Sequence, residues 1–300
     1  MSNYHSPVLL HESIDALAIK EDGVYVDVTF GGGGHSREIL NRLGKSGKLF
    51  AFDQDPDALA NEIDDERFVL IPENFRYISR FLRFHRIKKV DGILADLGVS
   101  SHQFDEAERG FSTRFEGDLD MRMNQKSKKS AQEIINNYSE EQLAAILFAY
   151  GELRNSRKIA RLIVHDRGNK KIETSFQLKE ALRTVLPKAK EHKILAQIFQ
   201  AIRIEVNEEL DVLKEFLEQV PNLLNEEGRL SVISYHSLED RLVKRFIRTG
   251  LFEGEPEKDV FGNSNEPLKK VGKLIVPKPE EIKVNNRARS AKLRIATLKN

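Results

Sequence analysis

Short apolar runs alternate with amphipathic segments over the first hundred residues of this 300-residue chain. Strands are predicted at the apolar runs Val24–Phe30, Leu49–Asp53, Phe68–Ile71 and Val90–Asp96. Helices are predicted between them at His35–Leu43, Pro56–Ile63 and Phe75–Phe84, with Asp55 and Pro56 as the cap and first residue of the second. Strict alternation of strand and helix predicts a parallel sheet with right-handed crossovers.

The alternation stops between residues 103 and 202, where helical spacing dominates and no run is a strong strand candidate. The helix-like segments there are Gln142–Leu153, Ser156–His165, Ser175–Leu186 and Lys193–Ile204. Alternation then returns with a helix at Asn207–Leu224, a strand at Arg229–Tyr235, a helix at Leu238–Arg248 and a strand pair at Lys273–Val276 and Ala291–Leu298. We therefore predict an α/β domain in two parts, 1–102 and 203–300, with an all-helical insert at 103–202. The polar stretches Ser112–Ser130 and Glu253–Pro267 are predicted to be mobile loops.

Charge is balanced over the whole chain but not along it. The chain has 48 Lys and Arg against 47 Asp and Glu, so its bulk charge does not attract a polyanion. Pro267–Asn300 nevertheless carries seven Lys and three Arg against two Glu, and the helix Phe75–Lys89 adds a further six cations. Such segments favour a polyanionic partner on one face, although a solvated charged face explains any single stretch as well.

Missing residue types exclude several kinds of site. The chain has no cysteine, which removes disulfides, cysteine-ligated zinc, iron–sulfur clusters and a thiolate nucleophile. It has no tryptophan, so base stacking would fall to Phe, Tyr, His or Arg. No assembled metal site, membrane-spanning run or signal pattern is evident, which predicts a cytoplasmic protein without a membrane partner. The oligomeric state is left open, a dimer included.

Four successive glycines, Gly31–Gly34, join the first predicted strand to the first helix. Glycine lets a ligand approach the backbone closely, and the amides of the following helix then face that ligand. The second strand ends at Asp53, about 20 residues after Gly33, where nucleotide-binding α/β folds place the carboxylate for the ribose hydroxyls. This pair predicts a nucleoside-containing cofactor, with a glycine-rich turn in an unrelated α/β protein as the alternative.

Two further strands end in polar residues at the same sheet edge. Asp96 ends the fourth strand, where its carboxylate would accept a hydrogen bond from an adenine amino group or bind a ligand's ammonium group. The alternative is that Asp96 only caps the next turn. Gln103 is a weaker candidate contact. Tyr235 and His236 end the fifth strand and offer a stacking face and a titratable group. The alternative there is that Ser237 caps the following helix, and both interpretations can hold together.

Eight ordered motifs resemble those of the bacterial 16S rRNA (cytosine-N4) methyltransferases. They are TFGGGGHS, FDQDP, ADLGVSSHQF, AERGFS, LDMRM, FQAIRIEVNEEL, SYHSLEDR and NNRARSAKLR, and the amino-terminal HSPVLLHE is similar too. The resemblance covers almost the whole chain, from His5 to about Arg294. Gly117-Asp118 stands where the family pattern has Gly-Pro, and the FSTRF stretch also varies; both changes lie in a loop.

The resemblance implies a class I S-adenosylmethionine-dependent methyltransferase fold with an inserted helical domain for substrate recognition. It implies N4-methylation of a cytidine in the decoding region of 16S rRNA, with that RNA or the small ribosomal subunit as partner. The family's cofactor contacts fall on Gly33, Gly34, His35, Asp53, Phe75, Asp96 and Gln103. Phe75 would offer a ring for adenine to pack against.

The absence of cysteine separates two cytosine chemistries. Methylation at C5 normally needs covalent attack by cysteine, whereas methylation at N4 needs only direct displacement at the sulfonium methyl, with the acceptor held in line. Candidates for the acceptor pocket are Ser100, Ser101, Tyr235 and His236, and candidates for RNA binding are Arg287, Arg289, Lys292 and Arg294. Two other functions stay open: an NAD(P)-dependent oxidoreductase, weakened by Ser36 in place of the third glycine, and a non-catalytic ribosome-assembly factor.

Overall fold

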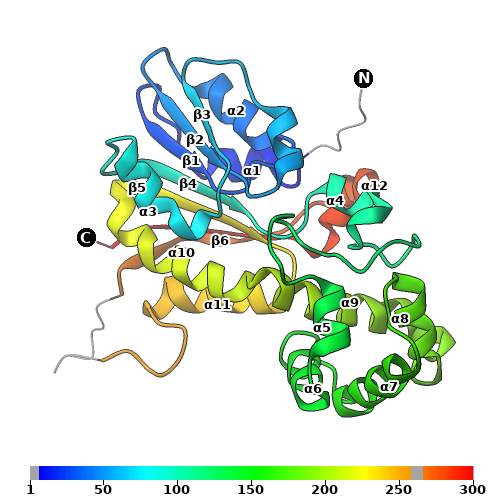
Figure 1. Ribbon diagram of the computed structural model, residues 1–300. Helices are drawn as coiled ribbons and strands as arrows, with labels where there is room; N and C mark the ends of the chain where they lie inside the picture. The colour runs from blue at the N-terminus through cyan, green and yellow to red at the C-terminus, as the bar shows by residue number, and fades with distance from the viewer. Residues whose placement is uncertain (1–6, 258–265, 300) are drawn as a thin grey trace. The chain divides into compact units, whose positions relative to one another are not determined.

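The chain forms two compact units in the computed structural model, which describes residues 7–257 and 266–299 (Figure 1). One unit consists of Met1–Gly98 and Leu210–Asn300, and the other is Val99–Glu209. Each unit encloses buried apolar side chains of its own. The His5 and Ser6 positions of the amino-terminal motif and most of the predicted loop Glu253–Pro267 lie outside the described residues.

The first unit is built on a seven-stranded mixed sheet with the order β3-β2-β1-β4-β5-β7-β6. The strands are β1 (Val24–Asp27), β2 (Lys48–Phe52), β3 (Phe68–Ile71), β4 (Val90–Asp96), β5 (Leu224–Ser234), β6 (Leu268–Ile275) and β7 (Lys292–Leu298). β1 to β5 run parallel, and β7 is antiparallel to both of its neighbours. This sheet, interrupted by helices between β4 and β5, confirms the predicted fold class.

Helices cover both faces of the sheet, as expected for parallel strands that are buried on both sides (Figure 1). α3 (Ile78–Phe84), α10 (Glu209–Leu223) and α11 (Ser237–Thr249) bury apolar side chains in one core with β1, β4 and β5. α1 (Leu10–Asp15) and α2 (Gly34–Arg42) enclose a second core on the other face. α12 (Pro279–Val284) precedes β7.

The second unit contains helices and short turns, with an isolated bridge between Asp118 and Thr174. Its α-helices are α4 (Ser101–Asp105), α5 (Ala131–Asn137), α6 (Glu140–Ala149), α7 (Ser156–Asn169), α8 (Ser175–Ala181) and α9 (Glu191–Asn207). Their inward faces form one apolar cluster, to which the stretch predicted as a mobile loop contributes Leu119 and Met121, both fully buried. That stretch is therefore anchored, because its apolar residues complete the core.

Several predicted boundaries shift for identifiable reasons. β6 begins at Leu268, five residues before the predicted start, because pairing with β7 recruits lysine-rich residues that looked like a loop. The helix predicted at Ser175–Leu186 ends at Ala181 and continues as a separate 3-10 turn. The prediction that Ser237 caps α11 is wrong: His236 is the cap, in a reciprocal capping box with Glu239.

Candidate active site

The glycine loop turns the chain from β1 into α2 and needs two of its glycines for different reasons. Gly33 is the N-cap of α2 at φ 73°, a left-handed conformation that strains other residues. A Cβ on Gly34 would lie 2.2 Å from the ring of Pro7, so its bare backbone lets the amino-terminal segment pack on the loop. Both predicted contacts therefore sit where the first turn of α2 leaves backbone amides available.

Asp53, directly after β2, is tied to this loop. Its Oδ2 accepts the Gly31 N–H at 2.8 Å and its Oδ1 accepts the Asp55 N–H at 2.9 Å. Burial raises the pKa of Asp53 to about 6, against the lowering effect of these two amides. An ionised carboxylate has about four acceptor positions, so two remain for hydroxyl groups of a ligand.

Asp96, at the end of β4, connects two other predicted residues. Its Oδ1 accepts the Tyr235 hydroxyl at 2.7 Å, and its Oδ2 lies 3.7 Å from Nδ1 of buried His35. Burial raises the pKa of Asp96 to about 6, although His35 and the Tyr235 hydroxyl oppose the rise. The cap of the next helix is Ser100, so the carboxylate of Asp96 makes tertiary contacts across strand ends instead of capping that turn.

His35 also joins the amino-terminal segment to the loop. Its Nε2 lies 3.2 Å from the Val8 carbonyl oxygen, which accepts a hydrogen bond when that nitrogen carries the proton. Phe75, the remaining predicted contact of this unit, lies in the turn after β3 with its ring half-buried. That ring packs edge-on against Phe216 at 5.4 Å, which fixes its plane while leaving part of it accessible.

Asp27 was missed by the sequence reasoning because the predicted first strand ran through it to Phe30. It is 1% exposed, accepts the Ser36 hydroxyl at 2.7 Å through Oδ2 and accepts the Thr29 N–H at 3.1 Å through Oδ1. Thr29 Oγ1 in turn accepts the Asp96 N–H at 2.7 Å. Burial raises the pKa of Asp27. An acid four residues before a glycine run was the available signal.

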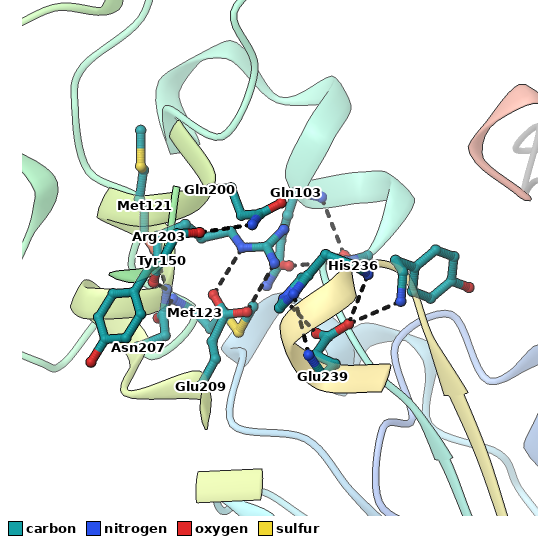
Figure 2. A network of polar contacts seen from close by, with 12 residues as sticks. Gln103, Met121, Met123, Tyr150, Gln200, Arg203, Asn207, Glu209, His236 and Glu239 are labelled. Atoms are coloured by element: carbon teal, nitrogen blue, oxygen red, sulfur yellow. Dashed lines mark hydrogen bonds and ion pairs between the residues drawn. The ribbon is translucent and has the colours of Figure 1, made fainter. Parts of the chain in front are cut away.

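Glu239, which the sequence pattern did not indicate as a site residue, organises the end of β5. Its Oε2 accepts the N–H groups of Tyr235 at 2.9 Å and His236 at 3.3 Å, while its Oε1 lies 3.1 Å from His236 Nε2 (Figure 2). Burial, together with the neighbouring Asp96, raises the pKa of Tyr235 well above its ordinary value. Tyr235 therefore stays a neutral hydroxyl that donates to Asp96.

Ser100, Ser101 and Gln103 belong to the helical unit, where they begin α4. Ser100 Oγ accepts the Gln103 N–H at 3.2 Å, and the Gln103 side-chain oxygen accepts the Ser100 N–H at 3.1 Å. Gln103 is 5% exposed. Ser100 and Gln103 thus form a capping box, which gives both residues a structural role in this unit.

Three of the sequence motifs meet inside the helical unit around Asn207. The Asn207 Nδ2 donates to the Met121 carbonyl oxygen at 2.8 Å, and its Oδ1 accepts the Met123 N–H at 2.8 Å (Figure 2). Arg109 Nη2 donates to the Arg122 carbonyl oxygen at 2.9 Å. AERGFS and LDMRM are thereby fastened to the end of α9, which carries FQAIRIEVNEEL.

The four basic residues predicted to bind RNA divide into two pairs. Arg294 Nε lies 2.7 Å and Lys292 Nζ 3.2 Å from the carboxylate of Asp240 on α11. Burial opposes ionisation of Asp240, but these two cations outweigh it, so its pKa is lowered. Arg287 and Arg289 lie in the turn before β7, and Arg289 is exposed. The β7 cations are used in packing α11 on the sheet.

Among the residues that the structure describes, no helix is both long enough and apolar enough to cross a bilayer.

A model of the MraW methylase family matches residues 2–299 of the chain. A protein of Christiangramia forsetii called ribosomal RNA small subunit methyltransferase H is 67% identical over 296 residues, covering 99% of this chain and 98% of that protein. A Bacteroides fragilis protein of the same name is 55% identical over 299 residues, covering 99% and 98%. The crystal structure of an rRNA methylase from Streptococcus thermophilus aligns over 97% of both chains at 15% identity and a TM-score of 0.41.

Proposed function

The chain belongs to the MraW methylase family, and from this we propose that it methylates the exocyclic N4 of a cytidine in the decoding region of 16S rRNA. The chain is an S-adenosylmethionine-dependent methyltransferase acting on small-subunit rRNA. The structural observation that supports the proposal of N4 methylation is a cluster of side chains at the carboxyl edge of the sheet. There Asp96 joins Tyr235 and His35 beside the glycine loop held by Asp53.

The residues present suit S-adenosylmethionine, which supplies an electrophilic methyl group when bound. Asp53 has acceptor positions for the two ribose hydroxyls, and the half-buried ring of Phe75 offers a face for adenine. Asp96 would accept from the adenine amino group or hold the ammonium, and Gly33, Gly34 and His35 would form the loop wall. Gln103, from the helical unit, is retained as a further proposed contact.

Tyr235 is proposed to prepare the acceptor amine. Because its hydroxyl proton is donated to Asp96 at 2.7 Å, the lone pairs of the phenol oxygen are available to accept an N–H of the cytosine amine. That hydrogen bond would draw the nitrogen lone pair out of conjugation and toward the methyl group. Holding the acceptor in line supplies roughly 7–11 kcal/mol of the barrier in well-oriented systems.

No covalent enzyme intermediate is proposed. The chain has no cysteine to attack C6, the step on which C5 methylation normally depends. S-adenosylmethionine held by the glycine loop, Asp53 and Asp96 would supply its methyl group to N4 and leave as S-adenosylhomocysteine, and the nitrogen would lose a proton to water or a nearby base. Glu239 fixes the backbone that carries Tyr235 and His236, which supports the proposal that their side chains contact the acceptor base.

The helical unit is proposed to recognise the RNA or the small subunit. Support comes from its separate core and from the three motifs fastened around Asn207. Arg289, which is exposed, is proposed to contact phosphate. Arg287, Lys292 and Arg294 are retained as further proposed contacts, and two of them, Lys292 and Arg294, also pair with Asp240.

Mass spectrometry of 16S rRNA nucleosides from a deletion strain tests the proposal. We expect N4-methylcytidine to fall and to return when the purified chain is incubated with deletion-strain small subunits and S-adenosylmethionine. Loss of 5-methylcytidine instead would refute the chemistry. Single-turnover transfer of a labelled methyl group separates the enzyme from a non-catalytic assembly factor, and tight binding of NAD in place of S-adenosylhomocysteine would favour the oxidoreductase.

A further inference from the structure

A basic hollow of about 970 Å³ lies in the sheet unit, away from the carboxyl edge. Its wall includes Asp91 near the start of β4, Arg229 in the middle of β5, and residues along most of β6 and β7. Arg229, in its wall, lies five residues before Ser234 along β5, or roughly 17 Å at the usual rise of a strand. None of the residues proposed to hold the cofactor or the acceptor base lines the hollow, so it is distinct from the candidate active site.

Nine cations and three carboxylates line this hollow. The cations are Lys20, Arg229, Lys244, Arg248, Lys269, Lys270, Lys273, Arg294 and Lys299. Three of them have carboxylate partners: Lys20 with Asp91, Arg294 with Asp240 and Lys299 with Glu266. Within residues 7–257 and 266–299, the other six form no ion pair. A chain of almost balanced charge thus concentrates six uncompensated cations at one place.

The strand register shows how these charges are distributed. Arg229 on β5 and Lys269 on β6 both pair with Thr297 of β7, so the two cations lie on the same face of the sheet, about 10 Å apart. Lys270, the next residue, points to the opposite face, where α11 carries Lys244 and Arg248. Positive charge therefore continues around the β6 edge from one face to the other.

Lysines on an edge strand often serve to prevent pairing with another sheet. That role explains Lys269, Lys270 and Lys273, which lie on β6. It does not explain Arg229, which lies on an interior strand, or Lys244 and Arg248, which lie on a helix. Cations contributed by three elements to one concave surface indicate a ligand with several negative charges.

We infer that this hollow binds the phosphodiester backbone of the rRNA substrate, as a second contact surface remote from the methylated base. The inference rests on the proposed rRNA substrate. Tyr25 is the sole aromatic residue of the lining and is fully buried, so no ring is presented for base stacking. Four of the six uncompensated cations are lysines, which bind phosphate as point charges without reading bases. The contact would therefore position the RNA independently of sequence.

The test measures binding of the full chain to small ribosomal subunits and to 16S rRNA transcript as salt is varied. Lys244→Gln with Lys269→Gln should flatten the slope of log affinity against log salt by roughly 1.4–1.8, at 0.7–0.9 per lost phosphate contact. The matched control, Lys45→Gln with Lys48→Gln, removes two exposed lysines near β2, far across the same sheet, and should leave the slope unchanged. S-adenosylhomocysteine affinity should be equal in all three proteins.

Equal slopes for a folded hollow variant and its control would overturn the inference. If the first variant does not fold, Arg248→Gln with Lys270→Gln repeats the test on the same surface. Displacement of RNA by millimolar inorganic phosphate at constant ionic strength would assign the hollow to a small phosphate-bearing ligand instead. The experiment measures RNA binding and does not depend on methylation. If the wild-type chain made no N4-methylcytidine, the proposed function would be refuted. A difference in salt slope between the hollow variant and its control would still support the binding surface.

Discussion

Replacing Asp53 by asparagine should separate cofactor binding from folding. The carboxylate accepts N–H groups from Gly31 and Asp55, and asparagine can keep only one of these bonds in the same geometry. Loss of the charge-assisted bonds to the ribose should cost about 1.5–3 kcal/mol of binding free energy. That range corresponds to an affinity for S-adenosylmethionine that is roughly 10–150-fold weaker.

The stability of the free protein should change much less. Burial raises the pKa of Asp53 from 3.8 to about 6, so ionised Asp53 lowers the free energy of unfolding by up to about 3 kcal/mol at pH 8. The free energy of unfolding is not lowered below pH 3.8, and the lowering develops as pH rises from 3.8 through 6. Asparagine removes this lowering but loses one backbone hydrogen bond, and the two effects offset each other to within about 2 kcal/mol.

Calorimetric titration with S-adenosylmethionine at pH 5 and pH 8, together with urea unfolding, measures both effects. The affinity of the wild-type protein for S-adenosylmethionine should rise between pH 5 and pH 8 as Asp53 ionises. The Asp53→Asn protein should lose much of this rise. The part that remains comes from Asp96, whose pKa is also about 6. Exposed Asp64→Asn is the matched control and should behave as wild type. Unchanged affinity in a folded Asp53→Asn protein would remove this carboxylate from the cofactor site.

Other changes test the remaining parts of the site. Replacing Tyr235 by Phe and His236 by Ala together should slow single-turnover methyl transfer by roughly 10²-fold or more, while affinity for S-adenosylmethionine stays within a few-fold. A wild-type rate in this variant would show that the acceptor pocket lies elsewhere, most directly at Ser100 and Ser101. Replacing residues 103–202 by a short linker should preserve S-adenosylhomocysteine binding and abolish methylation of small subunits, and retained methylation would show that the helices are dispensable. Asp240→Asn should destabilise the fold by about 1–2 kcal/mol in urea unfolding at pH 7, because Arg294 and the partly exposed Lys292 lose their charged partner. The wild-type contribution of this pair should disappear as pH falls below about 4, since the pKa of Asp240 is lowered in the folded state.

Much of the sheet could be predicted because its strands are short apolar runs between helices with clear start signals. Asp55 illustrates this: its side chain accepts the Asp57 N–H and Pro56 follows it, as predicted for a helix start, although the segment is a 3-10 helix that ends at Asn61 instead of Ile63. Strand ends also located Asp53 and Asp96, because the carboxyl ends of parallel strands share one edge. The pairing of Tyr235 with Asp96 could not be predicted, since it depends on β4 and β5 being neighbours.

Sequence reasoning was incomplete where one residue type can serve two purposes. Lys292 and Arg294 stay predicted RNA contacts, but their alternation along β7 also places both beside Asp240 of α11, a packing role that the sequence did not indicate. Ser237 is a common cap residue, yet His236 takes the position because Glu239 accepts its backbone N–H. Asp27 was hidden inside an apolar run, where a buried carboxylate is costly without the hydroxyl and amide donors that only the folded loop supplies.

The pairing of β4 with β5 has a consequence for synthesis of the chain on the ribosome. β4 ends at Asp96, and its partner strand begins at Leu224, after the whole helical unit has been made. At 5–20 residues per second, roughly 6–26 s pass between these two points. During this interval β1 to β4 can assemble with one side of β4 still unpaired. Nascent chains are thus most exposed to edge-to-edge aggregation then, and slow translation of the helical unit would prolong the risk.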